Sequence, residues 1–418
     1  MKKSGGPVRS FPLAEAAASE FAKQQASLPL PDFSDTEKTF NHLSDGELRK
    51  AARLFKLMGQ EWLTRVMSRL GVSAVQYGIP GAAWGVRNTI YHQFVGGTNL
   101  LTALPRIGRL YERKVTSMLD YGVEAKTKTE DFNAYMKEVI RSLEFSAEAP
   151  AAIAAVVKIS GIAPVSLLES LNGETVDFDD DSHAAFQAAL RRLDAICGKA
   201  QELGLQVYID GEESWIQNTI DQLTNKMMAR YNKQKVVVVN TFQMYRHDRL
   251  EFLISSYEKA QKEGYLLGAK LVRGAYMVKE NKRASEEGYP TPIQPSLEAT
   301  HADYNTAAKF CLEHLESICC CIGSHNEASV RLMTEMMRDR LIPRNHPHVH
   351  FAQLLGMSDN LTFNLAAGGY NVSKYMVYGP VEEVLPYLVR RAQENTSVTG
   401  EIGRELKMIK EELARRRQ

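Results

Sequence analysis

Short apolar runs alternate with amphipathic stretches from about residue 116 to residue 395 of the chain. Several runs are rich in Val and Ile and show no polar alternation, which is typical of strands buried on both faces of a parallel sheet. The predicted strands are Thr116–Tyr121, Ala152–Ile159, Gln206–Ile209, Lys235–Val239, Ala269–Val272, Ser317–Ile322, His348–Phe351 and Val372–Val377.

Most of these runs are followed by residues whose apolar positions recur with the 3.6-residue period of a helix. Among the predicted helices are His183–Leu203, Glu213–Tyr231, Leu250–Glu263, Thr300–Leu315 and Glu327–Arg338. Eight strands that alternate with helices over roughly 280 residues predict an α/β protein with a (β/α)8 barrel. A doubly wound open sheet is the alternative, but such sheets usually contain fewer units.

The sequence divides into an N-terminal helical arm over residues 1–112, the barrel over residues 113–396 and a helical C-terminal tail over residues 397–418. The first 40 or so residues mix Ala, Ser and Pro and predict a loosely held segment. Periodicity predicts further helices over Leu43–Leu70 and Leu100–Lys114.

Two flanking stretches allow more than one interpretation. Gly71–Gly97 is rich in Gly and small apolar residues and could be a packed loop or touch a membrane, with packing favoured. Glu401–Gln418 predicts an amphipathic helix that ends in three arginines. We expect a solvated tail there, with a membrane surface or a partner as the alternative contact.

The bulk composition excludes several classes of protein. A net charge of +1 argues against a nucleic-acid partner, and no apolar run reaches the ~18 residues of a transmembrane helix. The basic N-terminus lacks the apolar core of a secretory signal, although an organelle transit peptide stays possible. Five cysteines without a CxxC spacing predict a reducing compartment and no zinc site. We therefore expect a cytoplasmic protein, or a mitochondrial one if the source is eukaryotic.

Polar side chains stand near the carboxyl end of every predicted strand, where a (β/α)8 barrel carries its function. They are, from the first strand to the eighth, Asp120 and Glu124; Lys158; Asp210; Asn240 and Gln243; Arg273 to Tyr276; Ser324, His325 and Asn326; Gln353; Tyr375 and Tyr378. Any one of them could be an ordinary loop residue, but together they predict a functional face at this end of the barrel.

Lys158 ends an otherwise apolar strand, so it must pair with an acid or meet a ligand. It could form a Schiff base, contact a ligand carboxylate, or form a structural ion pair with Glu124 or Asp210. His325 follows a strand, either as a functional group or as a loop cap. His346, His348 and His350 alternate like metal ligands, but they open a strand at the opposite end, so we predict no metal.

The helix expected after the last strand carries two adjacent arginines. Tyr387, Arg391 and Glu394 share one face, and Arg390 lies about 100° away. Such a pair can clamp a carboxylate or phosphate, whereas the plain alternative is a solvated helix with an internal Arg–Glu pair. The chain contains no GxG and no Walker A motif, so a nucleotide cofactor would be held at strand ends such as Leu271–Tyr276.

Four segments resemble the flavin-dependent proline dehydrogenases in their single-function form. They are Leu271–Tyr276 (LVRGAY), Ser324–Asn326 (SHN), Phe351–Met357 (FAQLLGM) and the run from Tyr375 through Gly379-Pro380 and Tyr387–Arg391 to Asn395. They occur in the family's order over roughly Ser117 to Asn395. The resemblance implies a distorted (β/α)8 barrel, FAD over the strand ends and the eighth helix above the barrel.

The resemblance also implies roles for individual residues. Arg390, Arg391 and Lys158 would hold the carboxylate of proline, with Asp210 near Lys158, and Glu124 would pair with Arg390 when the site is empty. The ring of proline would be walled by Tyr276, Tyr375, Tyr387, Leu355 and Ala275. The flavin would be contacted by Asp210, Asn240, Gln243, Lys270, Arg273, Gly274, Ala275, Met277, Thr300, Ser324, His325, Asn326, Gln353, Arg391 and Glu394.

The chain departs from the family pattern at three of these positions. Lys270 stands where bacterial bifunctional members have Arg, Asn240 replaces a Gln, and Met277 replaces a Trp beside the adenine. The sequence shows no resemblance to the aldehyde dehydrogenase module or the DNA-binding arm of the bifunctional members, so we predict neither the second oxidation step nor repression.

The activity implied by the resemblance is oxidation of L-proline to pyrroline-5-carboxylate, with electrons passed to a membrane quinone through a peripheral membrane contact. Hydroxyproline dehydrogenase is the alternative within the family, which Tyr375 disfavours because the ring would clash with a 4-hydroxyl group. Outside the family, the alternatives are an aldolase that uses Lys158 and an inactive scaffold.

Overall fold

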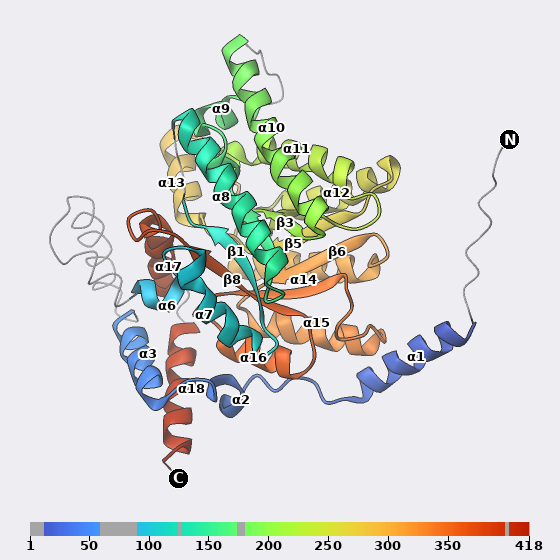
Figure 1. The fold of residues 1–418 in the computed structure, drawn as a ribbon, viewed down its shortest axis with the longest axis vertical. Helices are drawn as coiled ribbons and strands as arrows, with labels where there is room; N and C mark the ends of the chain where they lie inside the picture. The colour runs from blue at the N-terminus through green and yellow to red at the C-terminus, as the bar shows by residue number, and fades with distance from the viewer. Residues whose placement is uncertain (1–11, 59–89, 124–126, 174–179, 398–400, 418) are drawn as a thin grey trace.

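Eight parallel strands close into a barrel in chain order, β1 to β8, and β8 pairs with β1 (Figure 1). The structure is a computed structural model that describes residues 12–58, 90–123, 127–173, 180–397 and 401–417. The strands are β1 (Thr116–Tyr121), β2 (Ala152–Val157), β3 (Gln206–Ile209), β4 (Val238–Gln243), β5 (Leu267–Val272), β6 (Ile318–Gly323), β7 (Val349–Leu354) and β8 (Val372–Tyr378). The predicted (β/α)8 barrel is confirmed.

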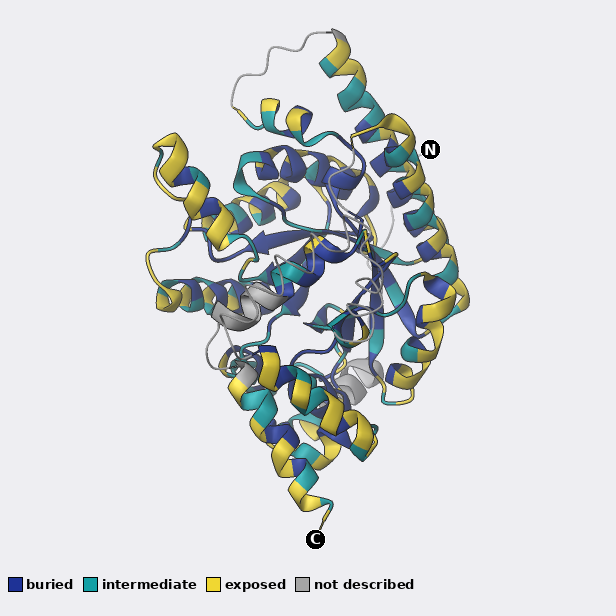
Figure 2. Ribbon diagram, turned by 90° about the vertical axis from the view of Figure 1, so that its left-hand side faces the viewer, coloured by how far each residue is buried: buried dark blue, intermediate teal, exposed yellow. Residues whose placement is uncertain are grey.

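Helices connect the strands and surround the barrel. They are α8 (Thr129–Glu148), the 3₁₀ turn η2 (Ile159–Gly161), α9 (Val165–Ser170), α10 (Asp180–Leu203), α11 (Ser214–Tyr231), α12 (Arg249–Glu263), α13 (Met277–Glu287), α14 (Leu297–Glu313), α15 (Glu327–Asp339), α16 (Asp359–Ala367) and α17 (Leu385–Ser397). Their inward faces are buried and their outward faces are exposed (Figure 2), as the amphipathic periodicity predicts.

The residue range predicted for the fourth strand, Lys235–Val239, was wrong. β4 begins at Val238 and continues through Gln243, because it pairs with β5 from Asn240 onward. Val236 and Val237 are buried but precede the strand. The apolar run therefore includes only the first two residues of β4 and the segment before it. The polar half of the strand, from Asn240 to Gln243, was not predicted.

The three consecutive cysteines lie on β6, and their side chains pack in two different parts of the core, one inside the barrel and one outside it. Cys319 and Cys321 pack inside the barrel with Tyr208 and Ala352, whereas Cys320 packs outward in the core beneath the helices. All are free thiols, and burial raises the pKa of Cys319 to about 11. These cysteines are therefore small, uncharged packing side chains, as the alternation predicts.

Helices from both ends of the chain pack beside the barrel. The N-terminal ones are α1 (Pro12–Ser27), α2 (Thr36–Phe40), α3 (Asp45–Met58), α6 (His92–Phe94) and α7 (Leu100–Tyr111), and the last one is α18 (Glu401–Arg415). None of these described helices, nor any in the barrel, is long and apolar enough to cross a membrane. Most of the stretch Gly71–Gly97 lies outside the described residues.

Two expectations about the flanks were wrong. The segment up to residue 40 is not loosely held throughout, because Phe33 is fully buried and its carbonyl accepts a hydrogen bond from Asn360. The C-terminal helix is not a solvated tail, because α18 packs on α2 and α3 (Figure 1). Buried apolar side chains hold both segments, and the low overall hydrophobicity of each segment concealed them.

Glu412 of α18 joins the two ends of the chain. Its carboxylate is fully buried and accepts hydrogen bonds from Thr36 at 3.0 Å, from Arg415 at 2.9 Å and from Arg416 at 2.8 Å. Arg416 also donates to the carbonyl oxygens of Phe40 and Leu43. Hydrogen bonds from Arg415, and then those from Arg416 and Thr36, lower the pKa of Glu412 to about 2.

We predict that Glu412→Gln lowers the free energy of unfolding by about 2 kcal/mol at pH 7, since hydrogen bonds to a charged group are lost. A depressed pKa stabilises the fold above the ordinary value near 4.5, and this benefit is lost as the pH falls toward 2. Denaturant titrations at pH 7 and pH 4 should therefore show a smaller difference in unfolding free energy between the wild type and Glu412→Gln at the lower pH. Glu411→Gln, at an exposed site on the same helix, is the control, and equal losses in both variants would contradict the assignment.

Candidate active site

Four charged side chains and one tyrosine meet inside the barrel at the carboxyl ends of the strands. Lys158 Nζ lies 2.9 Å from Asp120 Oδ2 and 3.3 Å from Asp210 Oδ2, and Lys270 Nζ lies 2.5 Å from Asp210 Oδ1. Tyr375 Oη completes the group, 3.3 Å from Lys158 Nζ. We call these five residues the charged layer. Both lysines are at least 95% buried, so each ammonium group depends on these acids for its stability.

Tyr375 contacts both carboxylates at once. Its hydroxyl oxygen is 2.8 Å from Asp120 Oδ2 and 2.7 Å from Asp210 Oδ2. A phenol has one proton and can donate to only one of them, so the second contact is a hydrogen bond only if that carboxyl group is itself protonated.

The surroundings shift the pKa values of the two carboxyl groups in opposite directions. Burial raises the pKa of Asp120, Asp210 raises it further, and Lys158 offsets these effects only in part. Asp210 is buried too, but Lys270 and Lys158 hold its pKa at about 2. Asp210 is therefore the more acidic of the two groups, and a proton shared within the charged layer is favoured on Asp120.

Asp120 was predicted at the functional face by its position at a strand end, but no role was assigned to it. The structure places it two residues after Met118, which packs inside the barrel, and alternate residues of a strand share a face. The proposed structural partner Glu124 lies outside the described residues. Of the two partners considered for Lys158, the structure places Asp210 beside it, with Asp120 closer still.

Helix α17 brings aromatic and cationic side chains to the same end of the barrel. Tyr387 is buried and belongs to a cluster that includes the partly buried Tyr375. The Arg391 guanidinium lies 5.3 Å from the Tyr387 ring centre, and that of Arg390 lies 5.4 Å from the Tyr276 ring centre. Tyr387 therefore packs beside Tyr375 of the charged layer, and each of the two arginines lies near the ring of one predicted wall tyrosine.

Leu354 joins this aromatic cluster, whereas the predicted wall residue Leu355 is buried in the core that surrounds the barrel. Ala275, the other small wall residue, is half-buried beside Tyr276. The prediction named Leu355 for this wall, but Leu354 is the leucine that packs beside the aromatic cluster.

Arg273 is held by several partners at the end of β5. It donates to His301 Nδ1 and Ser324 Oγ at 2.9 Å and to Ser329 Oγ at 3.0 Å. Its guanidinium also lies 4.3 Å from the centre of the Tyr304 ring. This arginine is therefore fixed in position before any ligand binds, which reduces the entropy lost on binding.

The ends of β6 and β7 are tied to each other. Gln353 donates to the Ser324 carbonyl at 3.2 Å, and Asn326 caps α15 by accepting from the backbone of Ser329 at 2.9 Å. His325 Nδ1 lies 2.9 Å from Ser358 Oγ, and burial, with nearby cations that include Arg391, lowers the His325 pKa to about 3. His325 is therefore a neutral imidazole at physiological pH.

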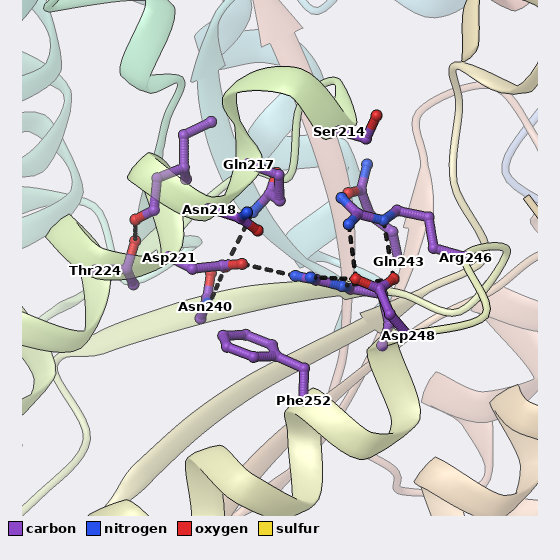
Figure 3. A network of polar contacts seen from close by, with 12 residues as sticks. Ser214, Gln217, Asn218, Asp221, Thr224, Asn240, Gln243, Arg246, Asp248 and Phe252 are labelled. Atoms are coloured by element: carbon purple, nitrogen blue, oxygen red, sulfur yellow. Dashed lines mark hydrogen bonds and ion pairs between the residues drawn. The ribbon is translucent and has the colours of Figure 1, made fainter. Parts of the chain in front are cut away.

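The two amides predicted on β4 have different surroundings. Asn240 is fully buried and donates to Asp221 Oδ1 at 2.9 Å, within a network that continues to Arg249 and Asp248 (Figure 3). That network links β4 to α11 and α12, outside the barrel. Gln243 donates to the carbonyl of Glu212 at 3.0 Å, while its buried Oε1 has no hydrogen-bond partner among the described residues.

The remaining predicted cofactor residues surround the start of α13 and α14. Gly274 has φ of +138°, and a Cβ there would lie 2.4 Å from the Tyr245 ring, so no larger side chain fits. Met277 is 46% exposed at the start of α13, whereas Thr300 is buried on α14. Glu394 is on α17, but its side chain lies outside the described residues.

Comparison with known proteins assigns the chain to a family. The family model described as "Proline dehydrogenase" matches residues 103–404. The chain belongs to the proline dehydrogenase family. This match covers the barrel, α17 and the charged layer, so the resemblance seen in the sequence is confirmed.

Individual members of the proline dehydrogenase family match at moderate identity. "Proline dehydrogenase 1, mitochondrial" of Dictyostelium discoideum is 29% identical over an alignment that covers 91% of this chain and 74% of that protein. The Drosophila melanogaster protein of the same name is 39% identical over 241 residues, which cover 55% of this chain. The match spans only 35% of the Drosophila protein.

The barrel also resembles a larger protein of known structure. Proline utilization A from Bdellovibrio bacteriovorus, inactivated by N-propargylglycine, aligns with a TM-score of 0.67 at 20% identity. The alignment covers 94% of this chain and 42% of that protein, and it supports the fold.

We predict that Asp210→Asn destabilises the protein by about 3 kcal/mol at pH 7, because two buried ammonium groups lose their carboxylate. The depressed pKa of Asp210 means that this loss shrinks as the pH falls from its ordinary value near 3.8 toward 2. Asp120→Asn should cost about 1 kcal/mol or less, since asparagine is neutral, like the protonated acid. Denaturant titrations compare the two variants, and a larger loss for Asp120→Asn would reverse the assignment of the proton.

Proposed function

We propose that the chain oxidises L-proline to pyrroline-5-carboxylate with FAD as its cofactor, and that the electrons pass to a membrane quinone. The observation that carries the proposal is the packing of Tyr387, from α17, in one cluster with Tyr375, which contacts Lys158 in the charged layer, while the adjacent arginines of α17 stack on Tyr387 and Tyr276. Three cations beside an aromatic wall suit a small amino acid with a carboxylate and an apolar ring. Membership in the proline dehydrogenase family supports the same substrate.

The residues present fit a flavin nucleotide. FAD, when bound, supplies the two-electron acceptor that protein side chains lack. Arg273 and Lys270 offer positive charge for an anionic cofactor, and Gly274 keeps the backbone beside them open to close approach. The buried Oε1 of Gln243 has an unused acceptor position that suits an N–H donor. Asn240 is engaged by Asp221, which leaves Gln243 as the better β4 contact.

The protein's main contribution would be the position of the substrate. Arg390, Arg391 and Lys158 would bind the carboxylate and so fix which carbon of the ring faces the cofactor. Tyr276, Tyr375 and Tyr387 would close around the ring. The buried side chains of α17 would exclude water, which strengthens each charge contact in the site.

The charged layer argues against the aldolase alternative. A Schiff base requires a neutral amine, and Lys158 lies within 3.3 Å of two acids that stabilise its ammonium form. Hydroxyproline as substrate is disfavoured by Tyr375, whose hydroxyl is fixed between these acids and cannot easily move aside for a 4-hydroxyl group. The names of the relatives support a mitochondrial location in eukaryotes, where a quinone in the inner membrane would accept the electrons.

We predict that Arg391→Met raises the KM for L-proline by roughly 100-fold, because a buried charge contact to the carboxylate contributes about 3 kcal/mol. Steady-state kinetics with an artificial acceptor measure this effect. Arg338→Met, at an exposed pair with Asp339 on α15, is the control and should leave KM unchanged. If Arg391→Met left KM unchanged, the arginine pair would not be the carboxylate clamp.

The visible spectrum of the purified protein, taken before and after anaerobic addition of L-proline, tests cofactor and substrate together. We expect flavin bands near ~450 nm that bleach with proline. Bleaching only by hydroxyproline would reassign the substrate and refute the argument from Tyr375. A colourless protein that cannot be reconstituted with FAD would refute the proposed oxidation.

A further inference from the structure

A cavity of about 630 Å³ opens at the amino-terminal end of the barrel, opposite the charged layer. Ile153, Val236 and Cys319 contribute apolar atoms to it, and loops that precede the strands form the rest of its wall. The volume is within the range of small-molecule sites. Nothing in the proposed proline oxidation uses this end of the barrel.

The charge at this cavity has one sign. Lys114 and Lys235 line it, together with His348 and His350, and no Asp or Glu is among the described residues of its lining. Neither lysine forms an ion pair within the described part of the chain. A Cβ added at Gly204, another lining residue, would lie 3.3 Å from Lys235 Nζ, so this ammonium group reaches over the mouth.

Most other polar side chains of the lining already have a partner within the protein. Asn371 donates to the carbonyl oxygens of His346 and Val349, and Gln206 donates to that of Val236. His350 Nε2 lies 2.7 Å from Ser373 Oγ, and His348 Nδ1 lies 2.6 Å from the carbonyl oxygen of Leu315. The ammonium groups of the two lysines, with the hydroxyl group of Tyr370, therefore remain as side-chain donors for a ligand.

The backbone at Lys114 is unusual for a lysine. Its φ is +59°, a left-handed conformation that glycine adopts without strain and other residues rarely adopt. The residue joins α7 to β1, where a glycine would serve equally well for the turn. The chain instead places a cation at the rim of the cavity.

We propose that this cavity binds a small carboxylate that carries a short apolar chain or ring. The two ammonium groups would bind the carboxylate as point charges, and the apolar part would rest on Ile153, Val236 and Cys319. Free phosphate suits the cavity less well, because it favours several oriented N–H donors, and the lining amides are already bonded within the protein.

Histidine NMR can test the proposal, because His350 lines this cavity while His325 lies at the opposite end of the barrel. The full-length protein, labelled with ¹³C at the histidine rings, is titrated with hexanoate, and the two signals are assigned with His350→Gln and His325→Gln. We expect a saturable shift of the His350 signal. Hexanol, which has the same chain without the charge, should shift it only at much higher concentration.

Charge variants complete the test. Lys114→Gln combined with Lys235→Gln should weaken the binding of hexanoate, read at His350, by about tenfold, since each exposed charge contact contributes a few-fold. Lys233→Gln, which removes a nearby lysine outside the lining, should not change it. The proposal fails if hexanoate shifts only the His325 signal, if hexanol binds equally well, or if inorganic phosphate displaces hexanoate at equal concentration. None of these outcomes depends on proline oxidation.

Discussion

The structure depends on the neutralisation of two lysine ammonium groups inside a closed barrel. Lys158 and Lys270 have almost no contact with solvent, so the ends of β1, β3 and β8 must supply acids and a hydroxyl within hydrogen-bond distance. This requirement fixes the inward face of each strand, because a shift of one residue would move every charged side chain to the outer face. The small side chains beneath the charged layer, such as Ala154 and Cys321, leave room for the barrel to close around it.

Much of the fold could be predicted from the sequence because the strands are apolar on both faces and the helices are amphipathic. β1 and β3 have the predicted bounds. β4 was misplaced because the second half of the strand is polar yet buried, and no periodicity distinguishes such residues from a loop. The same limit explains Asn240, whose partner Asp221 is on another element and is not identifiable from local sequence.

The site was predictable as a region and less so as a set of contacts. Strand ends and the arginine pair pointed to the end of the barrel where the charged layer lies, since the carboxyl ends of parallel strands converge there. Asp120 was placed on this face without a role, because its contacts with Tyr375 and Lys158 are evident only from distances in the structure. The docking of α18 could not be foreseen either, because the partners of Glu412 include Thr36, nearly four hundred residues earlier in the chain.

The packed interior of the barrel limits how small molecules can reach the charged layer. Met118, Val156, Tyr208 and Cys321 are almost entirely buried at mid-height and leave the barrel closed between its two mouths. Among the described residues, a molecule at the charged layer therefore has no open path through the barrel toward the opposite end. Molecules that exchange there do so at the end of the barrel where α17 packs against Tyr375.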